Sequence, residues 1–407
     1  MKKLFASVTR HLLACSILLG AFSCNSSNNA QSDSEYHVID FSSTIKNEAS
    51  VNLSSYVSDI NYIPIETNND FLLSDIKSIS ASEDYIYIVC KQTQGLFQLS
   101  PQGKLIKKIG TRGRAKNEYL AIRAVVANRS SVTIEISDKI IVYSAQTGEI
   151  ERIIVPSDFN NNNIQEFGST CFLDNGSIAI LSNKDIIENN LYIYDKEKNL
   201  LDSLKLFNSQ TRKIETIVPA ANIVSANGGP AKANSVKFQL NWGYSPDIYT
   251  DGKNLKVASP FMDTIMAYKN GKLVTHSILD YKNISDEQRF QPVMDTDLNI
   301  PVNSIKENEK FILFGNWSGY KFIYDKTSKE TKRIAKFENS NYQGFTNDID
   351  NGIPFWPVAV TKEKMYSFIS ADIFIEEAAK SNSEKMKQVA ATLTEESNPV
   401  IVVATLK

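Results

Sequence analysis

The residues of this chain best suited to binding chemistry are aromatic rings that stand beside amide and hydroxyl groups. Trp242 and Tyr244 are separated by a single glycine, and Trp317 and Tyr320 by a serine and a glycine. A flat apolar ring next to hydrogen-bonding groups is a surface to which sugars and peptides bind. We therefore expect these four residues to contact a glycan or a peptide. The alternative is that the rings only fill gaps in the packing.

A basic segment could supply the charge for such a site. Arg112 and Arg114 lie close together in the sequence, and Glu118 follows them. Guanidinium groups bind carboxylates and phosphates through paired hydrogen bonds, which are stronger than those between neutral groups. Arg112, Arg114 and Glu118 are therefore predicted to help bind the ligand, and solvated turn residues are the alternative interpretation.

Residue types that support catalysis are scarce. The chain has three histidines, and only His37 and His276 follow the apolar N-terminal run. A multi-histidine zinc site or a histidine-containing hydrolase triad therefore has little to draw on. His276 falls in a strand-like run and is expected to be a surface or packing residue. No phosphate loop, dinucleotide fingerprint or nucleophile elbow occurs, so we expect no catalytic residues, no metal and no cofactor.

Carboxylates leave one route to an enzyme open. Asp348, Asp350 and Asn351 precede Gly352, but this glycine comes one residue too early for a calcium-binding EF-hand loop. A solvated loop is the preferred interpretation of this cluster. The alternative function is a lyase or hydrolase that holds a metal at a central channel of the fold, with oxygen ligands gathered from several parts of the chain.

A four-strand pattern recurs along the chain and must position these residues. In its clearest copy, residues 76–109, four short runs rich in β-branched and aromatic residues are separated by turns. Similar units follow at residues 124–155, 169–207, 244–279, 302–337 and 358–406. Six units of about forty residues or more, with four strands each, predict an all-β fold, namely a six-bladed β-propeller of antiparallel blades.

The last unit lacks one strand, since only three strand-like runs follow residue 357. We predict that residues 59–66 supply the fourth, because pairing the N-terminal strand with the last blade removes open sheet edges that promote aggregation. Pro64 fits the outer edge of that blade, where a missing N–H loses no ladder hydrogen bond. The ring is therefore expected to close between the two ends of the chain.

The long connections are predicted to lie on one face of the propeller. In blades whose strands A to D run outward, the B–C and D–A connections emerge on the same face, and the long segments here are D–A connections. A helical insertion at residues 372–394 occupies a B–C position, and Ser381 with Glu384 resembles its capping box. We name this side the elaborated face and expect the apolar stripe around Met386 to pack on the blades.

The N-terminus carries an export signal. Two lysines precede an apolar run of about eleven residues, which is too short to span a bilayer and is typical of a signal peptide. Cys24 and a polar stretch follow, which resembles the junction of bacterial lipoproteins, where the cysteine is acylated. We therefore divide the chain into a signal peptide (1–23), a lipidated Cys24 with a polar tether (24–58) and the propeller (59–407). The alternative is a plain secretory signal or a short anchor.

The overall composition argues against one class of partner. The 407 residues include 44 Lys and Arg against 46 Asp and Glu, which gives a formal net charge of −2. No long basic stripe supplies the phosphate contacts that a nucleic-acid-binding protein needs. The expected partners are a glycan, a peptide or an envelope protein, with membrane contact through the lipid anchor alone and no nucleic acid.

Two sequence motifs resemble those of a known family. Residues 62–67, Tyr-Ile-Pro-Ile-Glu-Thr, look like the entry strand of the six-bladed β-propeller lipoproteins common in Bacteroides-type bacteria, which are related in architecture to NHL propellers. Residues 108–113, followed by Glu118 and Tyr119, look like their first inter-blade loop, although residues 115–117 replace the usual Gly-Pro-Gly. The resemblance implies the fold and a location on the cell envelope, at the outer membrane. We expect a non-catalytic binding or docking module.

Overall fold

The computed structural model divides the chain into two units, residues 1–35 and 36–407, and the propeller lies in the second. The structure describes residues 36–45, 47–73, 75–159, 164–173, 175–185, 188–208, 212–219, 235–242, 246–251, 254–258, 262–282, 302–316, 319–336 and 343–407. Within these ranges, no helix is long and apolar enough to cross a membrane.

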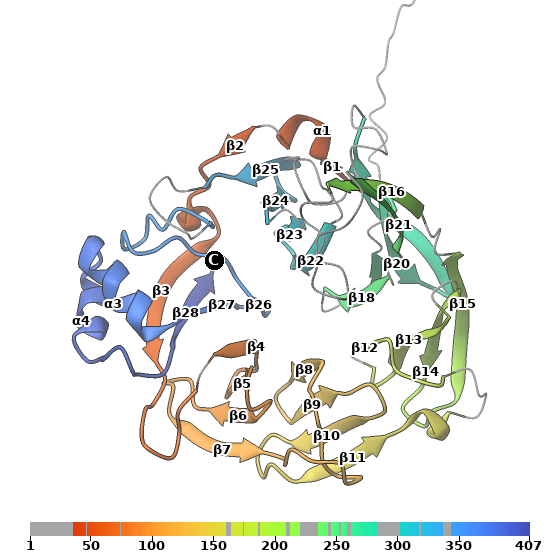
Figure 1. Cartoon of the computed structure of the whole chain (residues 1–407), viewed down its shortest axis with the longest axis horizontal. Coiled ribbons are helices and arrows are strands. Elements are labelled where there is room, and N and C mark those ends of the chain that lie inside the picture. The colour runs from red at the N-terminus through yellow and green to blue at the C-terminus, as the bar shows by residue number, and fades with distance from the viewer. Residues whose placement is uncertain are drawn as a thin grey trace, which may run out of the picture. The chain divides into compact units, whose positions relative to one another are not determined.

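Six four-stranded antiparallel blades form a ring, which confirms the predicted propeller (Figure 1). Blades 1 to 3 contain β4 (Ile76–Ala81) to β7 (Leu105–Ile109), β8 (Ala124–Ala127) to β11 (Ile150–Ile154), and β12 (Ser169–Phe172) to β15 (Leu200–Asn208). Blades 4 and 5 contain β18 (Asp247–Thr250) to β21 (Lys272–Asp280) and β22 (Val302–Glu307) to β25 (Glu330–Ile334). Blade 6 contains β26 (Ala359–Val360), β27 (Lys364–Ile369), β28 (Val400–Leu406) and β3 (Val57–Pro64). The remaining strands within these blades are β5 (Ile86–Cys90), β6 (Leu96–Leu99), β9 (Ser131–Glu135), β10 (Ile140–Ser144), β13 (Ile178–Asp185), β14 (Glu188–Tyr194), β19 (Leu255–Ala258), β20 (Thr264–Lys269), β23 (Phe311–Asn316) and β24 (Lys321–Asp325).

The middle strands of the blades are buried on both faces because each blade is covered by a neighbour on either side. All five residues of β5 are buried, and so are all five of β9. Separate apolar clusters fill the spaces between successive blades, so residues that alternate along one strand enter two different clusters. This explains why the strands read as near-continuous apolar runs in the sequence.

The N-terminal segment closes the ring and covers part of its rim. Strand β3 pairs antiparallel with β28, as predicted for residues 59–66. Before it, β1 (His37–Asp40) adds a parallel strand to β21, and β2 (Glu48–Ala49) adds one to β25, with α1 (Phe41–Thr44) and the short 3-10 helix at Leu53–Ser55 between the strands. Residues 36–58, which lie in the predicted tether, therefore belong to the folded unit and cover the outer edges of blades 4 and 5.

The helical insertion consists of two helices, α3 (Ala371–Lys380) and α4 (Glu384–Ala390), between β27 and β28. The predicted capping box is wrong by two residues. The N–H of Ser381 closes the last turn of α3, whereas the hydroxyl of Ser383 caps α4 by accepting the N–H of Met386 at 3.1 Å. Met386 is fully buried in the cluster of blades 5 and 6. The apolar stripe thus packs on the blades as expected.

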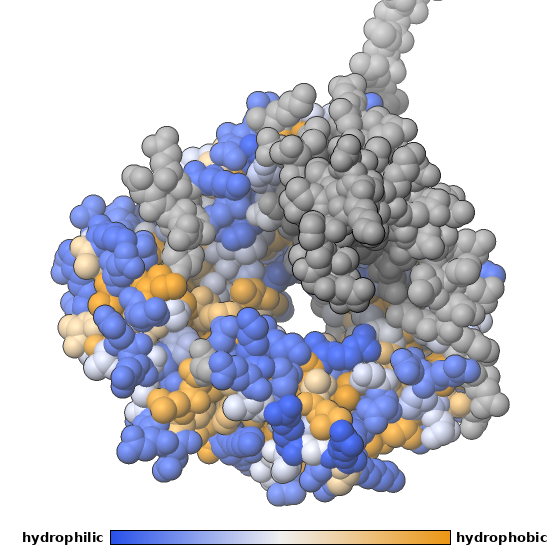
Figure 2. Space-filling model, viewed as in Figure 1, coloured by the Kyte–Doolittle hydropathy of each residue, from blue (hydrophilic) through white to orange (hydrophobic). Residues whose placement is uncertain are grey.

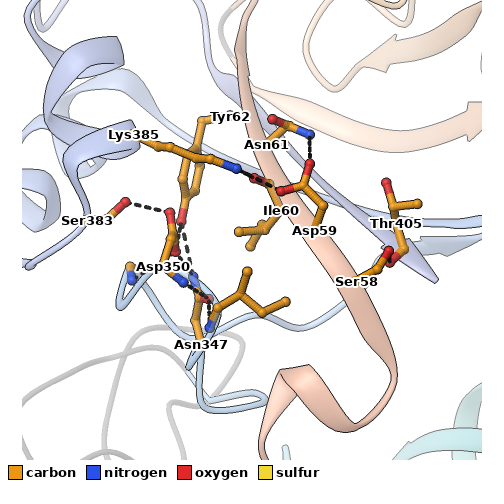
Figure 3. Close-up of polar contacts among 12 residues, drawn as sticks. Ser58, Asp59, Ile60, Asn61, Tyr62, Asn347, Asp350, Ser383, Lys385 and Thr405 are labelled. Atoms are coloured by element: carbon orange, nitrogen blue, oxygen red, sulfur yellow. Dashed lines mark hydrogen bonds and ion pairs between the residues drawn. The ribbon is translucent and has the colours of Figure 1, made fainter. Parts of the chain in front are cut away.

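A polar cluster around Asp350 fastens α4 to the ring (Figure 3). The Asp350 carboxylate accepts hydrogen bonds from the hydroxyls of Tyr62 at 3.1 Å and Ser383 at 2.5 Å, and from the Asn347 amide at 2.7 Å. It also accepts the backbone N–H of Gly352 at 3.1 Å. One carboxylate therefore joins β3, α4 and the loop that precedes blade 6.

Candidate functional site

A cavity of about 530 Å³ lies where the innermost strands of blades 2, 3 and 4 begin. These strand starts are on the elaborated face, since the D–A connections lead into them. Figure 2 shows an opening near the middle of the ring, with hydrophilic surface on its β8 and β12 side. The cavity is lined by Arg123, Ala124, Glu135, Gly168, Ser169, Thr170, Leu181, Pro246, Asp247 and Ile248.

Arg123 holds one wall of this cavity in place. Its guanidinium donates hydrogen bonds to the backbone carbonyls of Phe167 and Gly168, directly before β12. The same group lies 3.8 Å from a carboxylate oxygen of Glu135, and its side chain is 41% exposed. Arg123 therefore ties blade 2 to the first residues of blade 3, and its charge faces the cavity with several of its donors already used.

Two carboxylates from different blades line the same cavity. Glu135, at the end of β9, accepts hydrogen bonds from the hydroxyl and the N–H of Thr170, the latter at 3.0 Å. Burial raises the pKa of Glu135 above its usual value, although the bond from Thr170 and the charge of Arg123 oppose the shift. Asp247, at the start of β18, accepts the hydroxyl of Ser169 at 3.0 Å. The cavity thus combines two carboxylates, one guanidinium and two hydroxyls.

The predicted basic loop lies between blades 1 and 2. Arg112 and Arg114 are exposed and make no ion pair with any residue in the described ranges. Glu118 accepts the N–H of Ala115 at 2.9 Å and so stabilises the turn. The buried Lys139 donates to the carbonyls of Ala115 at 3.0 Å and Lys116 at 3.1 Å. The loop is therefore held from blade 2, with its two arginines in solvent.

Close packing around this loop explains why glycine occupies positions 110 and 113. Gly110 has a φ of +65°, and a Cβ there would lie 2.4 Å from the Tyr143 hydroxyl. A Cβ on Gly113 would lie 1.9 Å from the Glu118 carboxylate. Tyr119 fills the space between the two blades, where its hydroxyl donates to the Ile109 carbonyl at 3.1 Å. The Gly-Thr-Arg-Gly and Glu-Tyr residues of the predicted inter-blade motif thus fit one packed loop.

The structure describes only some of the aromatic residues that were predicted to bind the ligand. Tyr320 is 6% exposed and packs in the cluster between blades 4 and 5, where the Arg333 guanidinium lies 4.5 Å from its ring. This placement disagrees with an open stacking surface and reflects the large apolar area that the ring buries. Trp242 ends strand β17 (Ser235–Trp242), which pairs with β16 (Arg212–Pro219), and its side chain is outside the described set. Tyr244 and Trp317 lie outside the described residues.

The other candidate residues serve the packing of the fold. Asp350 accepts the hydrogen bond from Ser383 that fastens α4, whereas Asp348 accepts the N–H of Ser54 at 2.9 Å. The two carboxylates therefore have different hydrogen-bond donors. His276 donates to or accepts from two charged neighbours, Glu307 at 2.7 Å and Lys256 at 3.1 Å. It is a packing residue, as predicted, but within an ion network that the sequence did not reveal. No three His, Cys, Asp or Glu side chains in the described ranges lie close enough to hold a metal.

The cavity residues themselves were missed from the sequence. Arg123, Ser169, Thr170 and Asp247 stand at or next to the first position of an innermost strand, and Glu135 at the end of the strand beside it. Polar residues at strand ends are common, so each one alone carries little signal. The usable signal would have been their recurrence at the same place in three successive units.

The fold is a six-bladed propeller, and a polar cavity lies at the innermost strands of blades 2, 3 and 4. The chain belongs to the family described as a domain of unknown function, DUF4934, which matches residues 36–405. No curated protein matches the chain.

A solved structure has the same fold. A protein of Bacteroides fragilis, described provisionally as exported, is similar with a TM-score of 0.60 and 13% identity, over 91% of this chain and 99% of that one. The extracellular domain of a hybrid two-component system of B. thetaiotaomicron matches with a TM-score of 0.37 and 15% identity, over 69% of this chain and 30% of that one.

Proposed function

We propose that this protein is a lipid-anchored envelope propeller that binds a glycan at the mouth of its channel without catalysis. The observation that carries the proposal is the cavity shared by blades 2, 3 and 4, which gathers carboxylates and hydroxyls from three separate strands. Its volume of about 530 Å³ falls within the range of small-molecule sites. The description of the B. fragilis relative as exported agrees with an envelope location.

The chemistry of the cavity favours a ligand rich in hydroxyl groups. Carboxylate oxygens accept hydrogen bonds from sugar hydroxyls, and the hydroxyls of Ser169 and Thr170 lie among them. Trp242 stands four positions before Pro246 on the cavity wall, so their Cα atoms lie at most about 14 Å apart. A peptide or an envelope protein is the outcome to be distinguished by experiment.

A binding screen on glycan and peptide arrays tests the proposal. Asp247→Ala removes the acceptor on the blade 4 side, and we expect at least about a tenfold loss of affinity, as for a lost charge-assisted hydrogen bond. Asp84→Ala, on an exposed turn of the opposite face, is the matched control and should bind like the unmodified protein. Selective binding to peptides, or equal binding by both variants, would overturn the glycan proposal.

The predicted lipid anchor is tested separately. Cys24→Ser removes the thiol that would be acylated, so the protein should lose radiolabelled palmitate and leave the membrane fraction. Ser23→Ala, which keeps the thiol, is the control. Labelling that persists in the Cys24→Ser variant would refute lipidation at this residue while leaving the binding proposal intact.

The same carboxylates support a second candidate function. Glu135 has a raised pKa and Asp247 lies in the same cavity, an arrangement that could supply a general acid and a general base for a lyase or hydrolase. Glycans that bind on the array are incubated with the protein to decide between a binding module and an enzyme. New reducing ends or unsaturated products that disappear with Glu135→Gln would favour the enzyme over the binding module.

A further inference from the structure

Two lysines of blade 5 face the space between blades 5 and 6. Lys306 on β22 stands opposite Leu313, which stands opposite Ile323, and both apolar residues belong to the cluster shared with blade 6. Lys321 on β24 stands opposite Gly315 of β23. Gly315 follows Leu313 by two residues on β23 and therefore lies on the same face of the sheet. Since directly opposed residues in an antiparallel sheet point to the same face, both lysine side chains project toward blade 6.

Among the residues that the structure describes, no carboxylate pairs with either lysine. The Nζ atom of Lys321 donates to the backbone carbonyl of Gln343 and lies 5.4 Å from the centre of the Trp356 ring. The Lys306 backbone pairs with β23, but its side chain makes no hydrogen bond or ion pair with another described residue. Gly315 adds no side chain between the two lysines. As far as the described residues go, two cations, one aromatic ring and the Gln343 carbonyl therefore meet at this place.

The surroundings of both lysines disfavour the charged ammonium form. Burial lowers the pKa of Lys306, and burial together with the charge of Lys306 lowers the pKa of Lys321 to about 8. A buried ammonium without a counter-ion is destabilising. Side chains kept at a loss of stability are typical of binding sites.

We propose that Lys306 and Lys321, with Trp356 beside Lys321, form an anion site that binds a carboxylate group between blades 5 and 6. A carboxylate fits two lysine point charges, since the described residues supply neither a guanidinium fork nor a helix N-terminus at this place, which phosphate sites commonly use. The carboxylate could come from an acidic sugar or from a peptide C-terminus. None of these residues lines the cavity of blades 2 to 4, so the inference is independent of the proposed function.

Calorimetric titration tests this site with three probes: galacturonate, an N-acetylated dipeptide with a free C-terminus, and inorganic phosphate. Galacturonate binding would identify a sugar acid and dipeptide binding a peptide. Lys306→Met and Lys321→Met should each weaken binding of the carboxylate probe by about tenfold or more. Lys332→Met, on the outer strand of the same blade and paired with Glu330 at 3.2 Å, is the control and should bind normally.

A second measurement separates binding from a structural role. Because Lys306→Met removes an unpaired buried charge, this variant should melt at the same or a higher temperature than the unmodified protein while losing the ligand. A lower melting temperature would mean that Lys306 supports the fold. That result, equal or stronger binding of phosphate, or no binding of any probe would overturn the proposal.

Discussion

Glu307→Ala is expected to lower the free energy of unfolding by about 3–5 kcal/mol, as is typical when one partner of a buried ion pair is removed. The Glu307 carboxylate at the end of β22 is inaccessible to solvent. It accepts hydrogen bonds from Lys326 at 2.6 Å, His276 at 2.7 Å and the Tyr249 hydroxyl at 3.1 Å. Without it, three cationic or polar groups of blades 4 and 5 lose their shared acceptor.

The network around Glu307 continues through blade 4. His276 lies 3.1 Å from Lys256, whose side chain is only 2% exposed and pairs with Asp251 at 3.0 Å. Chemical denaturation monitored by tryptophan fluorescence measures the effect. Glu330→Ala is the matched control because Glu330 is 61% exposed and pairs with Lys332 on the outer strand of the same blade. That variant should lose less than about 1 kcal/mol, and an equal loss in both would contradict the structural role of the network.

The pH dependence of stability provides a further check on Glu307. Burial alone would raise its pKa, but the hydrogen bond and charge of His276 and the charges of Lys326 and Lys256 outweigh it and hold the pKa at about 2. A carboxyl group with a depressed pKa stabilises the fold above its unfolded value, about 4.3. Its contribution should fall as pH decreases from there toward 2. This part of the acid destabilisation should disappear in Glu307→Ala.

The buried neutral state of His37 should make the fold sensitive to acid at a higher pH than the titration of Glu307 does. Burial, the neighbouring His276 and the charge of Lys326 lower the pKa of His37 to about 4, despite the opposing charge of Glu307. The unfolded chain therefore takes up a proton near pH 6.5 that the folded chain does not. Stability should fall as pH decreases from about 6.5 to 4. Since His37 lies on β1, the N-terminal strand on the rim is sensitive to this change.

The repeat of the sequence was sufficient to predict the blades, because each one is a local unit of four short strands joined by turns. The closing strand was also predictable, since the last unit lacked a partner for its third strand. Strands β1 and β2 were not, because four and two residues are too few for any periodicity. Their pairing with β21 and β25 depends on residues more than two hundred positions away.

For the candidate site, the sequence predicted only the face of the propeller on which the cavity lies, not the residues that line it. The elaborated face followed from strand order, and the cavity lies there, but Arg123, Glu135 and Asp247 come together only when three blades close around the axis. The aromatic criterion was less reliable, since Tyr320 is buried between blades. A large ring contributes most when it is removed from water, so residue type alone does not distinguish a binding surface from core packing.

Asp350→Ala is expected to lower the free energy of unfolding by about 2–3 kcal/mol, because it leaves several buried donors without an acceptor. Three of these donors belong to side chains that are almost inaccessible, namely Tyr62 at 6%, Asn347 at 5% and Ser383 at 0% exposed. Water has little room to replace the carboxylate, since even a Cβ on Gly352 would lie 2.2 Å from the Tyr62 hydroxyl. The cost therefore comes from groups that remain after the substitution.

Asp348→Ala provides the matched control for this cluster. Asp348 lies two residues earlier in the same loop and accepts two hydrogen bonds, from the N–H and the hydroxyl of Ser54, but unlike Asp350 it is exposed. Water can replace those bonds, so this variant should lose less than about 1 kcal/mol. Urea denaturation of both variants measures the difference. If the two variants lost similar amounts of stability, the buried attachment of α4 through Asp350 would not be what fixes the insertion to the ring.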